Sequence, residues 1–161
     1  MPISDIYTAR SGSVANTVTT ANPLLSVYGT AAIRGWVLGC RVEVGVTGAI
    51  AGNSLLFQLA RPAATNTGTG LASMSAHDFS APASIMQQAI AWSTAPTPGV
   101  ILAEWELPQT TGSMWEEFPP TGYEWGIPAI ANANASAGLH LFVTASIATS
   151  TPVFVDMIVS E

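Results

Sequence analysis

The chain has 161 residues, a formal net charge of −6 and only 9 % charged residues, and it contains no lysine. Soluble proteins average about 25 % charged residues, so this composition indicates that partners cover part of the surface. Four scattered arginines in an acidic chain argue against nucleic acid as a partner, and no apolar run reaches the roughly 20 residues of a membrane span.

The charges divide into two blocks along the chain. Residues 1–62 carry four arginines and two carboxylates, whereas residues 63–161 carry eight carboxylates and no base. We interpret the second block as an acidic solvent face; the alternative is head-to-flank packing of copies. The single cysteine, Cys40, excludes an intrachain disulfide and, with no signal peptide apparent, indicates folding in a reducing cytosol.

The first half of the chain predicts an arm followed by long strands. Residues 1–23 are rich in Thr, Ser and Asn and predict an extended N-terminal arm, with a short strand at 5–9. Residues 24–161 then form one sandwich domain, beginning with a strand at 24–28. Apolar side chains occupy every second position from Trp36 to Val46, which predicts one long half-buried strand.

Alternation continues after a predicted turn at residues 48–53. Leu55, Phe57 and Leu59 predict a second long strand that ends at Pro62. Residues 65–75 are a loop by composition, because Gly68 and Gly70 lie among Thr, Asn and Ser. Residues 83–92 follow a proline and predict one short helix over an end of the sandwich.

The remaining chain predicts strands at 101–107, 114–118, 123–127, 139–147 and 153–159. About eight strands separated by Gly and Pro predict an all-β fold, an antiparallel β-sandwich or jelly roll with at most one short helix.

Catalytic chemistry finds little support in this composition. Without lysine there is no Schiff base and no phosphate-binding loop of the usual kind, and no serine lies in a G-x-S-x-G turn. Only His77 and His140 could act as bases or metal ligands. We expect His140 on the exposed face of its strand, and we predict no enzyme activity, no cofactor and no metal.

Two further clusters have plain structural interpretations. Glu104 and Glu106 lie about 7 Å apart on one strand face, a spacing that any exposed E-x-E pair shares with some glycosidases. Five aromatic residues lie between Trp105 and Trp125. We interpret Trp105 and Cys40 as core residues, and the other aromatic residues as core, subunit contacts or a sugar-binding platform.

Four segments of the chain together resemble head decoration, or cement, proteins of tailed bacteriophages. They are LARPAATNTGTG (59–70), WSTAPTPG (92–99), FPPTGYEWGIP (118–128) and GLHLFVTAS (138–146), and the likeness spans roughly residues 33–147. The resemblance implies a jelly-roll-like domain on the outer capsid surface, commonly a homotrimer, that clamps neighbouring major capsid subunits. It would be synthesised in the cytoplasm of the host bacterium. No functional residue set transfers from this family.

We therefore expect a virion structural protein whose partners are the major capsid protein and copies of itself. The alternative is a carbohydrate- or receptor-binding sandwich module of a phage tail or head fibre. Assembly contacts are expected from residues 1–30 and from loops at one end of the sandwich. The candidate contact residues are Ile3, Ile6, Tyr7, Arg10, Arg34, Arg61, Trp115 and Tyr123.

Overall fold

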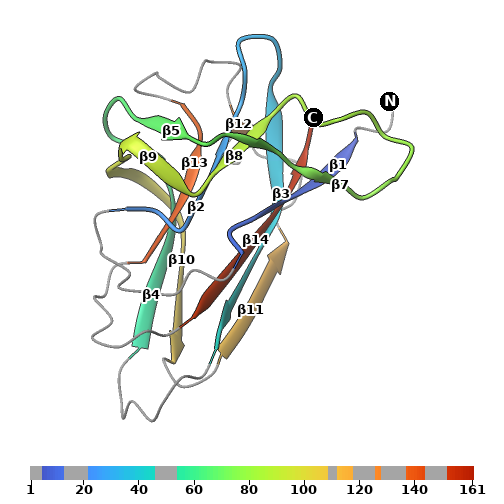
Figure 1. Ribbon diagram of the computed structural model, residues 1–161. Helices are drawn as coiled ribbons and strands as arrows, with labels where there is room; N and C mark the ends of the chain where they lie inside the picture. Colours follow the sequence, from blue (N-terminus) through green and yellow to red (C-terminus); the bar gives the residue numbers. More distant parts are fainter. Residues whose placement is uncertain are drawn as a thin grey trace.

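The structure, a computed structural model, describes residues 5–12, 22–45, 54–108, 112–117, 126–127, 137–143 and 152–161. These residues form an all-β protein in which two antiparallel sheets face each other (Figure 1). The described part of the chain contains no helix, and so no helix that is long and apolar enough to cross a membrane.

Sheet A and sheet B each contain four long or central strands and shorter additions at their edges. Sheet A has the order β11 (Gly112–Glu117), β3 (Gly35–Val44), β14 (Val153–Ser160), β1 (Ile6–Arg10) and β7 (Ser75–Ala76), and β12 (Gly126–Ile127) also pairs with β3. Sheet B has the order β10 (Pro98–Pro108), β4 (Ser54–Pro62), β13 (Leu139–Val143), β2 (Leu25–Tyr28), β8 (Gln87–Ala89) and β6 (Ala72–Ser73). A separate ribbon pairs β5 (Thr67–Thr69) with β9 (Ala91–Thr94).

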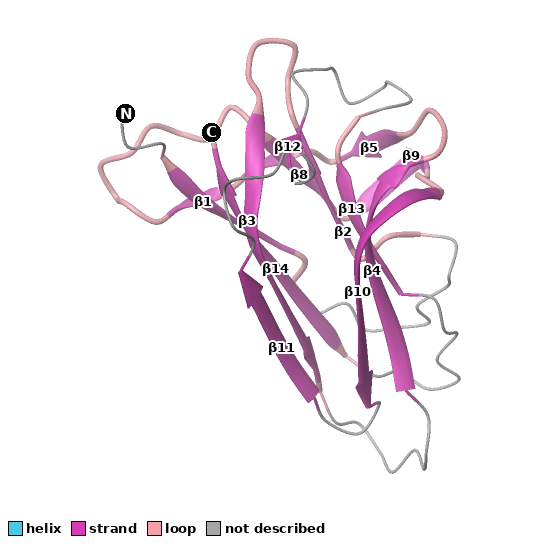
Figure 2. Cartoon of the chain, turned by 180° about the vertical axis from the view of Figure 1, so that it is seen from behind, coloured by secondary structure: helices cyan, strands magenta, loops and turns pink. Residues whose placement is uncertain are grey.

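The eight main strands pair as one long folded hairpin. Strand β1 pairs with β14, β2 with β13, β3 with β11 and β4 with β10, all antiparallel. Two further pairings, β3 with β14 and β4 with β13, join these four pairs into two sheets. Figure 2 shows the two sheets from behind, with β1, β14, β3 and β11 in one and β2, β13, β4 and β10 in the other. These pairings make the described part of the chain an antiparallel β-sandwich of two sheets.

Alternating apolar residues fill the space between the sheets, as the sequence predicts. In β14 the inward side chains are Val153, Val155, Met157 and Val159, and all four are buried. From sheet B, Leu55, Phe57, Leu59, Leu139 and Leu141 meet them in one core cluster. Cys40 belongs to the same cluster and is fully buried, which confirms its interpretation as a small apolar core residue.

The predicted alternation of the long strand at 36–46 is wrong for its first residues. Ile158 of β14 lies opposite Gly39, but the next residue, Val159, lies opposite Val37, so Leu38 is an extra residue in β3. This β-bulge reverses which side chains face inward. Val37 is buried, whereas Trp36 and Leu38 are only half-buried.

The short helix predicted for residues 83–92 is also wrong. This segment instead contains β8 and the start of β9. Glu161 fixes its first part, because its carboxylate accepts hydrogen bonds from the backbone N–H groups of Ile85 and Met86. The predicted loop at 65–75 likewise contains β5, β6 and the first residue of β7. Pairing with distant strands outweighs local composition in both segments.

Part of the predicted N-terminal arm belongs to the sandwich. Residues 6–10 form β1 between β14 and β7, and Tyr7 and Ala9 reach the core. Likewise, residues 25–28, within the 1–30 segment expected to make assembly contacts, form the fully buried strand β2. The predicted turn at 48–53 lies outside the described residues.

Candidate interaction surface

The outer face of sheet A carries a row of charged and aromatic side chains. Because alternate residues of β14, β3 and β1 point into the core, the residues between them point outward. Cross-strand pairing places Arg10 opposite Asp156, Asp156 opposite Arg41, and Arg41 opposite Trp115. We call these four residues the cross-strand row.

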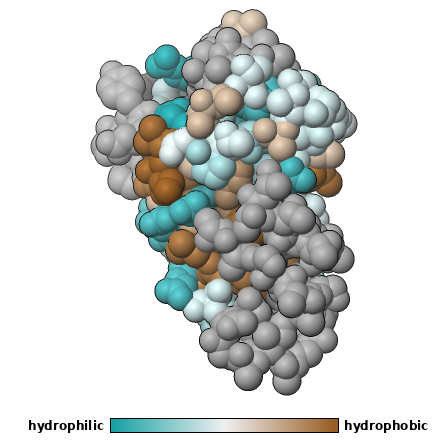
Figure 3. Space-filling view, turned by 90° about the vertical axis from the view of Figure 1, so that its left-hand side faces the viewer, coloured by the Kyte–Doolittle hydropathy of each residue, from teal (hydrophilic) through white to brown (hydrophobic). Residues whose placement is uncertain are grey.

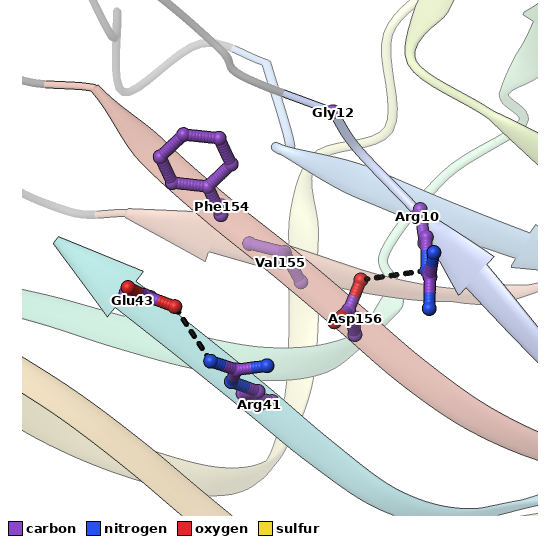
Figure 4. A pocket seen from close by; sticks show the side chains of 7 residues that line it. All are labelled: Arg10, Gly12, Arg41, Glu43, Phe154, Val155 and Asp156. Carbon is purple, nitrogen blue, oxygen red and sulfur yellow. Dashed lines mark hydrogen bonds and ion pairs between the residues drawn. The ribbon is translucent and has the colours of Figure 1, made fainter. Parts of the chain in front are cut away.

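The charges on this face form two ion pairs. Arg10 Nε lies 3.5 Å from the Asp156 carboxylate, and Arg41 Nη2 lies 2.7 Å from the carboxylate of Glu43. Exposed fractions are 66 % for the Arg10 side chain and 50 % for that of Arg41, so both guanidinium groups are accessible. Figure 4 shows the two pairs side by side on β1, β14 and β3. These four charges balance one another, and Glu117 on β11 adds one negative charge to the face.

A shallow depression of about 310 Å³ lies among these side chains. Its lining consists of Arg10, Gly12, Arg41, Glu43, Phe154, Val155 and Asp156. Phe154 is 41 % exposed and stands at one side of it (Figure 4). On β11, which pairs with β3, Trp115 is 49 % exposed and packs against Gly39. Its indole N–H donates to Glu117 at 3.3 Å. Exposed Arg, Trp and Phe side chains are typical of protein contact surfaces.

Of the eight candidate contact residues, Ile6, Arg10 and Trp115 lie on the outer face of sheet A. Arg34 is exposed in the connection between β2 and β3. Tyr7 is buried in the core, and Ile3 and Tyr123 lie outside the described residues.

Arg61, the remaining candidate, is half-buried. Its Nη2 donates to the carbonyl oxygen of Gly126 at 2.9 Å, and burial lowers its pKa. This hydrogen bond joins β4 of sheet B to β12 of sheet A. The structure therefore gives Arg61 a bracing role between the sheets.

Sequence reasoning missed four members of this face, namely Arg41, Glu43, Phe154 and Asp156. The signal was present in β14, where Phe154, Asp156 and Ile158 alternate with the buried valines and methionine. Their clustering depends on the register between β14, β3 and β1, which joins segments more than 100 residues apart. Periodicity alone does not supply that register.

The prediction that His140 is exposed is wrong. It is fully buried on β13, on the face of sheet B that points away from the main core. Its Nε2 donates to the carbonyl of Ala137 at 3.0 Å, so its Nδ1 is free to accept from the Ser26 hydroxyl at 2.7 Å. The ring also meets Tyr28 edge-on, with centroids 5.5 Å apart.

A network of hydrogen bonds extends from His140 to the β5–β9 ribbon. The indole N–H of Trp92 is shared between Ser26 Oγ at 3.2 Å and Tyr28 Oη at 3.1 Å. Tyr28 in turn donates to Asn66 Oδ1 at 2.8 Å, and Asn66 donates to the carbonyl of Ala137. Because both Ser26 and His140 are fully buried, this hydroxyl–imidazole pair is closed to a substrate in the folded chain.

Burial in this network sets the ionisation of His140. Loss of solvent lowers the pKa of the imidazole to about 4, and the hydrogen bond to Ala137 opposes this only in part. His140 is therefore neutral near pH 7. His77, by contrast, is exposed and its Nε2 is hydrogen-bonded to the Thr8 hydroxyl.

The carboxylates and tryptophans of the remaining chain fit structural roles. Glu104 and Glu106 are exposed on β10, and Glu104 accepts a hydrogen bond from Gln58. Trp105 packs at the margin of the core, and its indole N–H donates to Glu116 across the open side of the sandwich. Within the described residues, no three His, Cys, Asp or Glu side chains form a group that could hold a metal ion. Trp115 is the one exposed tryptophan there, so no exposed tryptophan cluster is formed.

Comparison with known proteins identifies no relative: no family model, no curated protein and no solved structure matches the chain.

Proposed function

We propose that this chain is a virion structural protein, a decoration protein that binds the outer surface of a phage head and stabilises it through contacts with the major capsid protein and with copies of itself. The four sequence segments that resemble this family support the proposal. The pairing of the eight main strands also supports it, because jelly rolls pair their strands in this order and viral capsid proteins commonly use that fold.

The observation that carries the proposal is a set of exposed apolar side chains in the segments between β7 and the first residues of β10. Phe79 is fully exposed, and the others are between 44 % and 64 % exposed: Ile85, Ile90, Val100 and Ile101. Figure 1 places these segments toward the upper end of the sandwich, where β5, β8 and β9 lie. Figure 3 shows the side formed by β4, β9 and β10, where hydrophobic patches reach the surface between hydrophilic ones.

Contact with a capsid explains why these exposed side chains are apolar. Five large hydrophobic side chains at the surface are costly in water, and a chain with 9 % charged residues has few charges to offset them. A contact that covers this end removes them from water. The loops at one end of the sandwich, rather than the arm, are thus the capsid-facing part in this proposal.

The test uses phage heads that lack the chain and the purified chain added back. We expect the chain to co-sediment with the heads and to give density on their outer surface in electron cryo-microscopy. The triple variant Phe79→Ser, Ile85→Ser, Ile90→Ser is expected to lose at least tenfold in binding, whereas Phe154→Ser on sheet A is the matched control and should bind normally. Full binding by the triple variant, or density on the tail alone, would contradict the proposal.

A further inference from the structure

We infer that the outer face of sheet A is a contact surface between two copies of this chain, related by a twofold axis that runs parallel to the strands between β14 and β3. This inference is independent of the proposed virion role and uses different residues. It rests on the order of side chains in the cross-strand row.

The cross-strand row is complementary to itself. Across the sheet it contains a cation, an anion, a cation and an aromatic ring: Arg10, Asp156, Arg41 and Trp115. A twofold axis between β14 and β3 places each residue of one copy over the mirrored position of the other. Asp156 then faces Arg41 of the second copy, and Arg10 faces the ring of Trp115 of the second copy. Each contact occurs twice, as an ion pair and as a cation–π pair.

The rows on either side fit the same axis. Ile158 lies directly opposite Gly39 in the register, so Ile158 of one copy lies over Gly39 of the other and meets the ring of Trp115 that packs there. In the other direction Phe154 lies opposite Glu43, so its ring covers the aliphatic stem of Glu43 in the second copy. The apolar residues therefore meet apolar atoms of the second copy.

Electrostatics favour this face over the others for pairing. Two copies with a net charge of −6 each repel one another at long range. The two ion pairs keep four charges of the outer face of sheet A partnered when water is removed, and Glu117 adds one negative charge at the β11 margin of this face. More of the acidic charge lies elsewhere, with Glu104 and Glu106 on β10 and Glu116 on the other face of β11.

The area of the face is sufficient for a weak specific dimer. Four strands spaced about 4.8 Å apart and about eight residues long cover roughly 500 Å² per copy. The total of about 1,000 Å² is near the lower limit for specific interfaces. We therefore expect a dimer that dissociates on dilution.

Sedimentation analysis of two charge-reversed variants, alone and mixed, tests this arrangement. At about 100 µM the unmodified chain should sediment as a dimer. Arg41→Asp places like charges opposite Asp156 of the second copy, and Asp156→Arg does the same opposite Arg41, so each variant alone should dissociate at least ten times more readily. An equimolar mixture should recover the dimer, because the heterodimer contains two Asp–Arg pairs and no like pair.

The control is Glu106→Arg, which makes the same change of charge on β10 of the other sheet and should leave the dimer intact. Thermal unfolding of each variant shows whether it is folded. A monomer or a trimer of the unmodified chain at 100 µM overturns the inference without any variant. A mixture that dissociates as readily as its components also overturns it.

Discussion

At the scale of single residues, His140 is the side chain whose environment departs furthest from expectation. It alternates with Leu139 and Leu141, so one face of β13 had to carry it, and that face was expected to meet water. In the structure it is fully buried beside Tyr28, and both ring nitrogens have hydrogen-bond partners. The ring contacts Ser26, Tyr28, Ala137 and Phe142 among the described residues, and none of these four carries a carboxylate that could balance an imidazolium.

A pH-dependent stability follows from this burial. The pKa of His140 is about 4 in the folded chain against 6.5 for the unperturbed side chain, so the unfolded chain binds a proton first as the pH falls. The stability contribution is complete above pH 6.5 and is lost progressively between pH 6.5 and 4. The full loss is roughly 3 kcal/mol in the free energy of unfolding. Urea denaturation at a series of pH values between 4 and 7.5 measures it.

The matched control for this prediction is His140→Gln, which keeps hydrogen-bonding capacity but cannot be protonated in this range. It should be less stable than the unmodified chain at pH 7.5 and should show a flatter dependence on pH between 6.5 and 5. An equally steep dependence in this variant would assign the effect to other groups.

At the scale of elements, the sequence predicted the core strands well, but it predicted neither the bulge in β3 nor the strands within residues 83–92. Strands such as β4 and β14 have a strict period of two because one side faces the core throughout, and that pattern is visible in the sequence alone. The bulge at Leu38 was not predictable, because its position depends on where β14 stops matching β3. The segment 83–92 was misjudged because its partners, β2, β5 and β6, are distant in the sequence or too short to show a pattern.

Part of the candidate surface was predictable from the sequence. Arg10 and Trp115 were among the candidate contact residues, and both lie on the outer face of sheet A. Asp156 and Arg41 lie between them because of the strand order of sheet A, which no local pattern shows.

Trp92 is one of the side chains that attach the β5–β9 ribbon to sheet B, together with the hydrogen bond from Tyr28 to Asn66. The N–H of Trp92 is shared by Ser26 and Tyr28. Trp92→Phe leaves these hydroxyls without their donor, and we expect a loss of about 1–2 kcal/mol in the free energy of unfolding. Amide hydrogen exchange in β5 and β9 should accelerate more than in β4 or β14.

The same substitution at Trp115 serves as the comparison. Its N–H contacts an exposed carboxylate, so Trp115→Phe should change stability by less than about 0.5 kcal/mol. Equal losses from the two variants would mean that the indole N–H of Trp92 does not hold the ribbon in place.

At the scale of the whole molecule, the edge strands of the two sheets carry part of the acidic charge. Strands β10 and β11 are the outermost main strands of sheet B and sheet A. Glu116 is set inward there and accepts the indole N–H of Trp105. An inward charge at a sheet edge discourages the addition of further strands, so the acidic residues of this side favour a discrete assembly over open-ended aggregation.

The last strand, β14, is needed to complete sheet A. Strand β14 lies between β3 and β1 in sheet A, so without it β1 loses the neighbour that pairs along its whole length. A chain ending at residue 152 is therefore expected to show no cooperative unfolding transition in urea, whereas removal of Glu161 alone should preserve one. A cooperative transition in the shorter chain would mean that the remaining strands form a stable unit by themselves.

Pairing of the first strand with the last also determines when the protein can acquire its structure in a cell. Ile6 finds its partner at Ser160, so the pairing of β1 with β14 waits until almost the entire described chain has been synthesised. Contacts this distant in sequence also make folding slow, on the order of milliseconds to seconds for β-sandwiches. Strands β1 and β3 therefore lack their shared neighbour β14 for most of translation, and sheet A is completed only after this strand has been synthesised.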